Sequence, residues 1–169
     1  IMIPSNHQTR EDDHMRVWDL HGDTIGTLGM HDWAPYSTEH KDECCDGNFA
    51  SNNAQVSIDR MAGMNFCQCY AIWTPDQADQ PDPLGFYRAG AAYLKQQLAD
   101  HAQLITQGRD SSEVDAAFAE GRVAAMLTVE SARALESGLD IVEEYVRDGV
   151  LRIDHPLSFF VFPDASCLP

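Results

Sequence analysis

The sequence predicts an α/β fold in which a mainly parallel sheet packs against helices. Three segments, at residues 16–21, 64–73 and 122–130, have the length and the apolar content of buried strands. Two segments with apolar residues at helical spacing, 84–105 and 139–149, follow the second and the third of these strands. Apolar strands that alternate with helices are typical of a parallel sheet with helices outside it.

The first strand, RVWDLH at 16–21, is followed by a polar excursion. Residues 27–60 contain turn-forming residues and charges and few apolar runs, so we expect mostly loop there. The segment QVSIDRMAG at 55–63 is expected to return the chain to the sheet through a short helix. The second strand, MNFCQCYAIW at 64–73, is rich in aromatic residues and ends at Thr74-Pro75.

The clearest predicted helix spans 84–105, where apolar side chains recur with a helical period. A shorter helix is expected to begin at Ser111 or Ser112 as its N-cap and to stop at Gly121. The third strand, RVAAMLTVE at 122–130, is an almost continuous apolar run, which is typical of a strand buried on both faces. A further helix is expected over 139–149, ending at Gly149.

The charge of the chain argues against two classes of partner. The 169 residues are a length for one domain, and they carry 27 acidic against 11 basic side chains, a formal net charge of −16. Such a polyanion repels nucleic acids and anionic membranes, so we expect neither as a partner. No apolar run is long enough to span a bilayer.

The compartment is expected to be the cytoplasm. Residues 1–15 have neither the basic nor the apolar region of a signal peptide and are interpreted as a disordered leader. Cysteines in that compartment are reduced thiols. Cys44-Cys45 and the Cys67/Cys69 pair lack the spacing of a zinc site, so we interpret Cys67 and Cys69 as small core residues of a strand.

The chemistry of the chain is expected at the carboxyl ends of its strands. His21 and Asp23 stand two residues apart at the end of the first strand, so their side chains point the same way, and Glu130 ends the third strand. An imidazole and two carboxylates suit Zn²⁺ or another divalent ion. Glu130 could bridge two ions, and such a pair would supply hydroxide from a shared water at neutral pH. Alternatively, His21 is hydrogen-bonded structure and Glu130 is an acid at a helix start.

Three blocks of sequence resemble the membrane (renal) dipeptidase family, the zinc dipeptidases of peptidase family M19. They are VWDLHGDTI, QVSIDRMAGMNFCQCYAIWTP and AFAEGRVAAMLTVESARALESGLDIVEEYVRDGV, and they cover about residues 16–150. The resemblance implies a TIM-like (β/α) barrel, two Zn²⁺ ions and hydrolysis of dipeptides. It places the metal ligands on His21, Asp23 and Glu130, with Glu130 as the bridging, catalytic carboxylate. For full-length members it implies a homodimer, while the oligomeric state of this chain stays open.

The chain also departs from the family pattern. Ser131 replaces the glycine that usually follows the glutamate, and Gly63-Met64 replaces a Gly-Gly pair. The family's further zinc-binding histidines, substrate-binding arginine and catalytic-region aspartate all follow residue 150. We therefore expect 16–150 to be the N-terminal part of a barrel truncated after about strand four. Residues 151–169 are expected to be an atypical tail of out-of-frame translation, so His155 is not assigned as a ligand.

Three functions remain open from the sequence. The first is a metal-dependent dipeptidase, of which this chain alone is an incomplete fragment with little activity. The second is a non-catalytic fragment, or a half-barrel that binds a partner chain through its exposed strand edges. The third is another amidohydrolase-like hydrolase, against which Asp23 argues, since such enzymes commonly open with two histidines at these positions.

Overall fold

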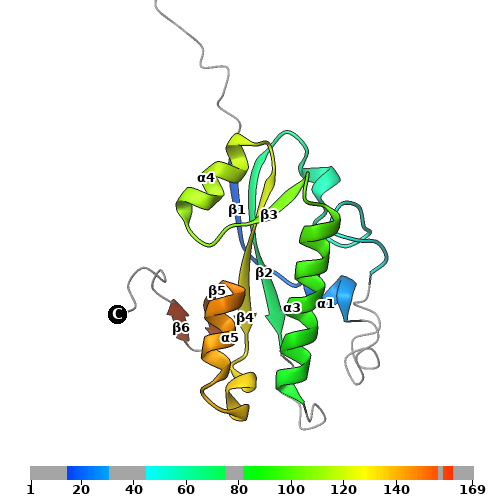
Figure 1. The fold of residues 1–169 in the computed structure, drawn as a ribbon. Coiled ribbons are helices and arrows are strands. Elements are labelled where there is room, and N and C mark those ends of the chain that lie inside the picture. The colour runs from blue at the N-terminus through cyan, green and yellow to red at the C-terminus, as the bar shows by residue number, and fades with distance from the viewer. Residues whose placement is uncertain (1–14, 31–44, 75–81, 156–157, 162–169) are drawn as a thin grey trace, which may run out of the picture.

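The computed structural model describes residues 15–30, 45–74, 82–155 and 158–161 (Figure 1). Its strands are β1 (Arg16–Gly22), β2 (Asn65–Trp73), β3 (Ile105–Gln107), β4 (Val123–Glu130), β5 (Val150–His155) and β6 (Ser158–Val161). Its α-helices are α1 (Thr24–Gly29), α3 (Pro83–Asp100), α4 (Ser111–Ala119) and α5 (Ile141–Asp148), and its short 3₁₀ helices are η2 (Ile58–Met61) and η3 (Arg133–Ser137). The expected leader, apart from Met15, and the end of the expected tail lie outside the described residues.

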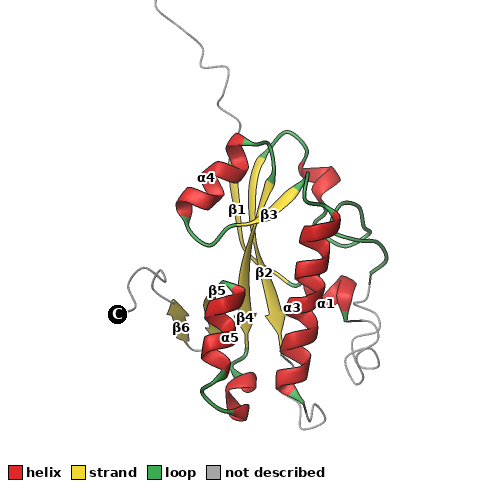
Figure 2. Cartoon of the chain, in the orientation of Figure 1, coloured by secondary structure: helices red, strands yellow, loops and turns green. Residues whose placement is uncertain are grey.

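The strands form one sheet in the order β1-β2-β4-β5-β6. All pairings from β1 to β5 are parallel, and only β5 and β6 run antiparallel. The short strand β3 pairs with the beginning of β4, and β5 pairs with the end of β4 along the same edge. The expected α/β class with a parallel sheet is confirmed, and β1, β2, β4 and β5 are arranged as part of a (β/α) barrel. Their carboxyl ends lie together (Figures 1 and 2).

Both faces of the central strands β2 and β4 are covered by helices. On one face the strands pack against α1, α3, η3 and α5, and the other face packs against α4, which lies across the end of the sheet where the strands begin (Figure 2). The first core includes Ile25, Leu28, Phe66, Tyr70, Ile72, Tyr87, Leu94, Leu127, Val129 and Tyr145, and the second comprises Cys67, Val114, Ala117, Phe118 and Ala124. Burial on both faces explains the almost unbroken apolar run of β4.

The expected helix at 84–105 is too long at its carboxyl end. The helix α3 begins as expected, where the Asp82 carboxylate accepts a hydrogen bond from the Gly85 backbone N–H, and it ends at Asp100. Residues 101–104 form a turn, and Ile105, 1% exposed, starts β3. Ile105 matches the helical spacing of the preceding apolar residues by coincidence. Its side chain is buried because the residue belongs to the strand β3.

The expected N-cap of α4 is also wrong by one residue. Asp110, rather than Ser111 or Ser112, caps the helix, since its Oδ1 accepts the Glu113 backbone N–H at 2.9 Å. An aspartate in extended conformation just before the helix is a stronger cap than a serine inside the first turn. The expected short helix within 55–63 is confirmed as η2, and the helix expected at 139–149 is α5.

Gly149 ends α5 in a left-handed backbone conformation, and β5 begins at the next residue. Its φ is +79°, and an added Cβ would lie 2.8 Å from Arg109 Nε and from Gln107 Nε2. We expect Gly149→Ala to lower the free energy of unfolding by about 1–2 kcal/mol, through left-handed backbone strain and this steric conflict. Gly121 is the matched control, because its φ is +69° with no atom within 4 Å of an added Cβ. Urea unfolding of the two alanine variants compares them, and an equal loss in both would exclude the steric contribution.

Candidate metal centre

His21 sits in an irregular part of β1. The parallel register of β1 with β2 runs to Asp19, which faces Gln68, and resumes at Gly22, which faces Tyr70, so that β1 has one extra residue there. A bulge of this kind redirects the side chains within it. The Asp19 carboxylate fixes the bulge, because it accepts the backbone N–H of His21 at 3.3 Å and the Gln68 Nε2 at 3.0 Å.

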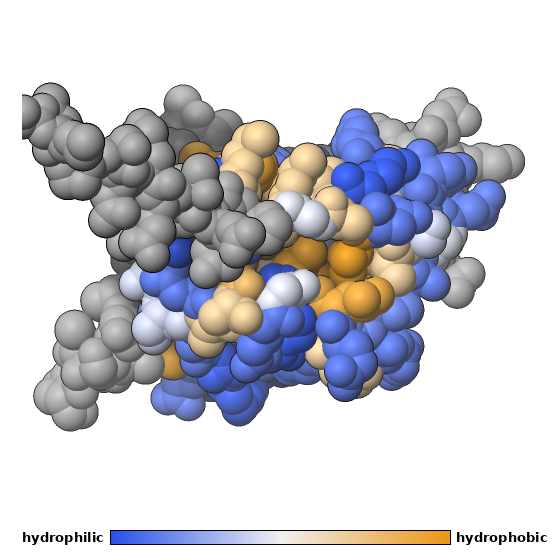
Figure 3. All heavy atoms as spheres, turned by 90° about the horizontal axis from the view of Figure 1, so that it is seen from above, coloured by the Kyte–Doolittle hydropathy of each residue, from blue (hydrophilic) through white to orange (hydrophobic). Residues whose placement is uncertain are grey.

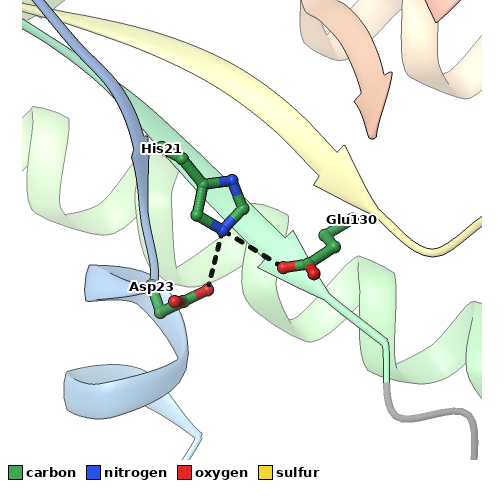
Figure 4. A group of neighbouring side chains, drawn as sticks. All are labelled: His21, Asp23 and Glu130. Carbon is green, nitrogen blue, oxygen red and sulfur yellow. Dashed lines mark ion pairs between the residues drawn. The ribbon is translucent and has the colours of Figure 1, made fainter. Parts of the chain in front are cut away.

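The three residues that the sequence singles out come together at the carboxyl ends of β1 and β4 (Figure 4). His21 Nε2 lies 3.5 Å from Asp23 Oδ1 and 3.2 Å from Glu130 Oε2. One nitrogen or oxygen of each side chain lies within 4.8 Å of the others. The side chains are 39%, 51% and 33% exposed in the order His21, Asp23 and Glu130, so the group is accessible from solvent.

The Asp23 carboxylate is not used as a helix cap, although its position would allow it. Asp23 is the N-cap residue of α1, and its side chain accepts no hydrogen bond from the first turn of that helix. N-cap aspartates normally satisfy one of these backbone donors. Here the carboxylate faces the imidazole of His21 instead (Figure 4), which leaves its oxygens available as ligands.

The spacing of the group suits a divalent ion. Ligand atoms about 2.0–2.1 Å from a tetrahedral Zn²⁺ lie about 3.4 Å from one another. The distances from His21 Nε2 to Asp23 Oδ1 and to Glu130 Oε2, 3.5 and 3.2 Å, are close to that value. One imidazole nitrogen and two carboxylates are also a donor set that Zn²⁺ and similar first-row ions accept. The residues present therefore fit a metal ion.

Burial and neighbouring charges disfavour the ionised form of the Glu130 side chain when no cation is bound. Burial raises the pKa of Glu130, and the nearby Asp23 and Asp154 carboxylates raise this pKa further. His21 opposes the shift through its charge and its hydrogen bond, without cancelling it. A bound cation would relieve the crowding of negative charge, because an opposite charge at short range favours the ionised form.

The sequence reasoning missed two residues beside this group, Asp154 and Arg152. Asp154 is the register partner of Glu130 on β5, and its Oδ2 lies 3.5 Å from His21 Nδ1. Arg152 forms an ion pair with Asp154. A signal was present, since VLRID is an apolar strand that closes on an acid, as LTVE does at Glu130. The atypical-tail interpretation placed both residues outside the barrel.

Ser131 follows Glu130 with a backbone that favours glycine. Its φ is +71°, and its N–H donates to the Asp154 carbonyl at 2.9 Å. We expect Ser131→Gly to raise the free energy of unfolding by up to about 1 kcal/mol, because glycine adopts this conformation without strain. Ser137→Gly is the control, since among the described non-glycine residues only Ser131 has a positive φ. Chemical denaturation should show a gain at Ser131 alone, and a loss there would contradict the strain argument.

A concave region lies at the opposite end of the strands from the His21, Asp23 and Glu130 group. A hollow of about 580 Å³ is bounded by Arg16, Gly63, Met64, Asn65, Asp115, Phe118, Ala119 and Gly121. The view of Figure 3, from above Figure 1, shows apolar residues framed by hydrophilic surface. The residues around this hollow do not include the His21, Asp23 and Glu130 group, and they present a mixture of polar and apolar side chains without clustered metal ligands.

Among the described residues, the buried cysteines do not belong to the group of candidate ligands. Cys67 and Cys69 are free thiols, 1% and 6% exposed, on consecutive inward positions of β2. Burial raises the pKa of Cys67 to about 12, which keeps it a thiol at neutral pH. The expectation that both are core residues is confirmed.

The comparisons with known proteins agree with the fold. The family model described as membrane dipeptidase (peptidase family M19) matches residues 12–154. This description contradicts the expected cytoplasmic location, which was inferred only from the absence of an export signal. Among the helices of the described residues, none has the length and apolarity needed to cross a membrane. Among proteins with curated descriptions, none matches the chain.

Three solved structures share the fold at low sequence identity. They are the metallo peptidase from Rhodobacter sphaeroides liganded with a phosphinate mimic of the dipeptide L-Ala-D-Ala, dipeptidase AC of family M19, and the probable dipeptidase PvdM from Pseudomonas aeruginosa. The identities are 17%, 19% and 13%, and the TM-scores 0.57, 0.56 and 0.54, in that order. The alignments cover 83%, 83% and 63% of this chain but only 45%, 42% and 30% of those chains. With the family model matched over most of its length, the chain belongs to the membrane dipeptidase family, peptidase family M19.

Proposed function

We propose that this chain provides part of the metal centre of a metal-dependent dipeptidase, with Zn²⁺ as the ion. The convergence of His21, Asp23 and Glu130 at the carboxyl ends of β1 and β4 carries the proposal. Family membership supports hydrolysis as the reaction class. The dipeptide mimic bound to the structure from Rhodobacter sphaeroides supports a dipeptide as the substrate.

The three side chains would have different tasks at this centre. His21 and Asp23 would hold one ion, and Glu130, with two carboxylate oxygens, would bridge this ion to a second. Ions held in this way lower the pKa of a shared water and polarise a peptide carbonyl. A ligand role for Glu130 is supported by its place at the end of the central strand β4, where its carboxylate lies 3.2 Å from His21 Nε2.

The first test is a Zn²⁺ titration of the purified chain, followed by a dipeptide hydrolysis assay. We expect Zn²⁺ to bind and to raise the melting temperature, because an ion that binds only the folded state stabilises it. We expect little turnover of a dipeptide such as Gly-D-Ala. Three protein ligands among the described residues cannot complete two four-coordinate zinc sites. Failure to bind Zn²⁺ would contradict the proposal.

A second candidate is a non-catalytic chain that binds metal or a partner. It is supported by the same His21, Asp23 and Glu130 group, since three such ligands bind an ion whether or not catalysis follows. For the chain by itself, both candidates predict Zn²⁺ binding with little turnover. The two differ in one outcome of the same assay, because substantial turnover would exclude the second candidate.

A further inference from the structure

The second ring nitrogen of His21 faces a buried carboxylate. His21 Nδ1 lies 3.5 Å from Asp154 Oδ2, while Nε2 of the same ring faces Asp23 and Glu130. The Asp154 side chain is only 10% exposed, against 39% for His21. It comes from β5, which is not a neighbour of β1 in the sheet. The contact therefore joins two strands that backbone pairing does not connect.

Arg152 holds the Asp154 carboxylate in place. Its Nε contacts Asp154 Oδ1, and its Nη2 donates to Asp154 Oδ2 at 2.8 Å, so the guanidinium binds both carboxylate oxygens. The same Nη2 donates to the Leu20 carbonyl at 2.7 Å. Leu20 directly precedes His21 in the bulge of β1, so Arg152 fixes both the carboxylate and the backbone beside the imidazole. Bidentate arginine–carboxylate pairs impose a defined geometry.

We propose that Asp154 is a positioning residue, which accepts the Nδ1–H of His21 and thereby presents the Nε2 lone pair to a bound ion. This proposal rests on the proposed function. A neutral imidazole carries one N–H, and the hydrogen bond at one nitrogen decides which nitrogen is available as the ligand. Carboxylates commonly orient ligand histidines in this way, and their removal weakens metal binding about 10–100-fold.

The test is Zn²⁺ affinity of the Asp154→Ala chain, measured by competition with a chromophoric chelator. We expect binding about 10–100-fold weaker than in wild type. Asp154→Asn should recover much of this loss, because its amide oxygen can still accept the Nδ1–H. Asp115→Ala is the matched control, since Asp115 is also paired with an arginine, Arg16, at 2.8 Å, at the other end of β1. Its affinity should equal that of wild type.

A second measurement follows the imidazole itself, independently of turnover. In Zn²⁺-loaded wild type, ¹⁵N NMR of His21 should show a protonated Nδ1 whose hydrogen exchanges slowly. In Asp154→Ala the exchange should become faster, and in Asp154→Asn it should be intermediate. If the alanine variant does not fold, the asparagine variant decides, and exchange as slow as in wild type would overturn the proposal.

The outcomes separate this inference from the proposed function. If wild type binds no Zn²⁺, the proposed function fails, and the role of Asp154 fails with it. If wild type binds Zn²⁺ and Asp154→Ala binds as tightly as the Asp115→Ala control, only the role of Asp154 is overturned. Weaker binding by Asp154→Ala, with the control unchanged and the Nδ1–H exchange accelerated, supports the proposal.

Discussion

His21→Ala is expected to weaken Zn²⁺ binding more than about 100-fold, a larger loss than removal of an orienting residue causes. His21 Nε2 lies 3.5 Å from Asp23 Oδ1 and 3.2 Å from Glu130 Oε2, so it would contribute one of the three protein ligands. Without it, two carboxylates remain, and such oxygen donors suit Mg²⁺ or Ca²⁺ better than Zn²⁺. A 100-fold loss corresponds to about 2.7 kcal/mol of binding free energy.

The measurement is a competition titration with a chromophoric chelator at neutral pH, repeated with the His101→Ala chain. His101 is the C-cap residue of α3 and lies near the start of β3, away from the carboxyl ends of the strands. The control removes an imidazole of the same kind, and its affinity should stay at the wild-type value. Equal affinities of the His21→Ala and wild-type chains would show that Zn²⁺ binds elsewhere and would remove the basis for the proposed centre.

The position of the His21, Asp23 and Glu130 group could be predicted because these residues stand at the ends of strands that the local sequence makes recognisable. Apolar runs located β1, β2 and β4, and parallel strands place their carboxyl ends together, so His21 and Glu130 were expected near each other. The structure places them at 3.2 Å. Alternation of side chains suggested that His21 and Asp23 share a side, yet a bulge in β1 and the start of α1 contribute to their approach. The pattern of apolar strands therefore predicted that His21, Asp23 and Glu130 lie close together, but it did not predict the bulge in β1.

The contacts of β5 could not be predicted in the same way. Arg152 and Asp154 reach the Leu20 carbonyl and the His21 ring across a separation of more than a hundred residues. No spacing rule encodes such a contact, since it depends on the strand order of the finished sheet. The strand β3 was missed for a related reason. Its three residues are too few to show a period, and Ile105 matched the preceding helix.

Glu130→Gln is expected to have opposite effects on metal binding and on the stability of the metal-free chain. The amide is a poor ligand and cannot bridge two cations as a carboxylate does, so Zn²⁺ affinity should fall more than about 100-fold. Without metal, burial raises the pKa of Glu130, which means that the folded chain disfavours the ionised carboxylate. The neutral glutamine does not incur this cost, and the variant should therefore unfold at a higher temperature than wild type at pH 7 without metal.

The pH dependence of stability tests whether ionised Glu130 destabilises the metal-free chain. A carboxyl group whose pKa is higher in the folded than in the unfolded chain makes the folded state bind more protons. The stability of metal-free wild type should therefore decrease as pH rises from the ordinary glutamate pKa, 4.5, through the raised folded value, and the Gln variant should lack this decrease. Below pH 4.5 the two chains should be equally stable.

Saturating Zn²⁺ should reverse the order of stability at pH 7, because only wild type gains the binding free energy. Thermal unfolding with and without Zn²⁺ measures both signs in one experiment. Glu136→Gln is the control, since Glu136 is an exposed acid paired with Arg133 on η3, and this substitution should leave the Zn²⁺ effect intact. A Glu130→Gln chain that is less stable than wild type without metal would mean that Glu130 is a structural acid. The preference for a cation at the end of β4 would then have no energetic basis.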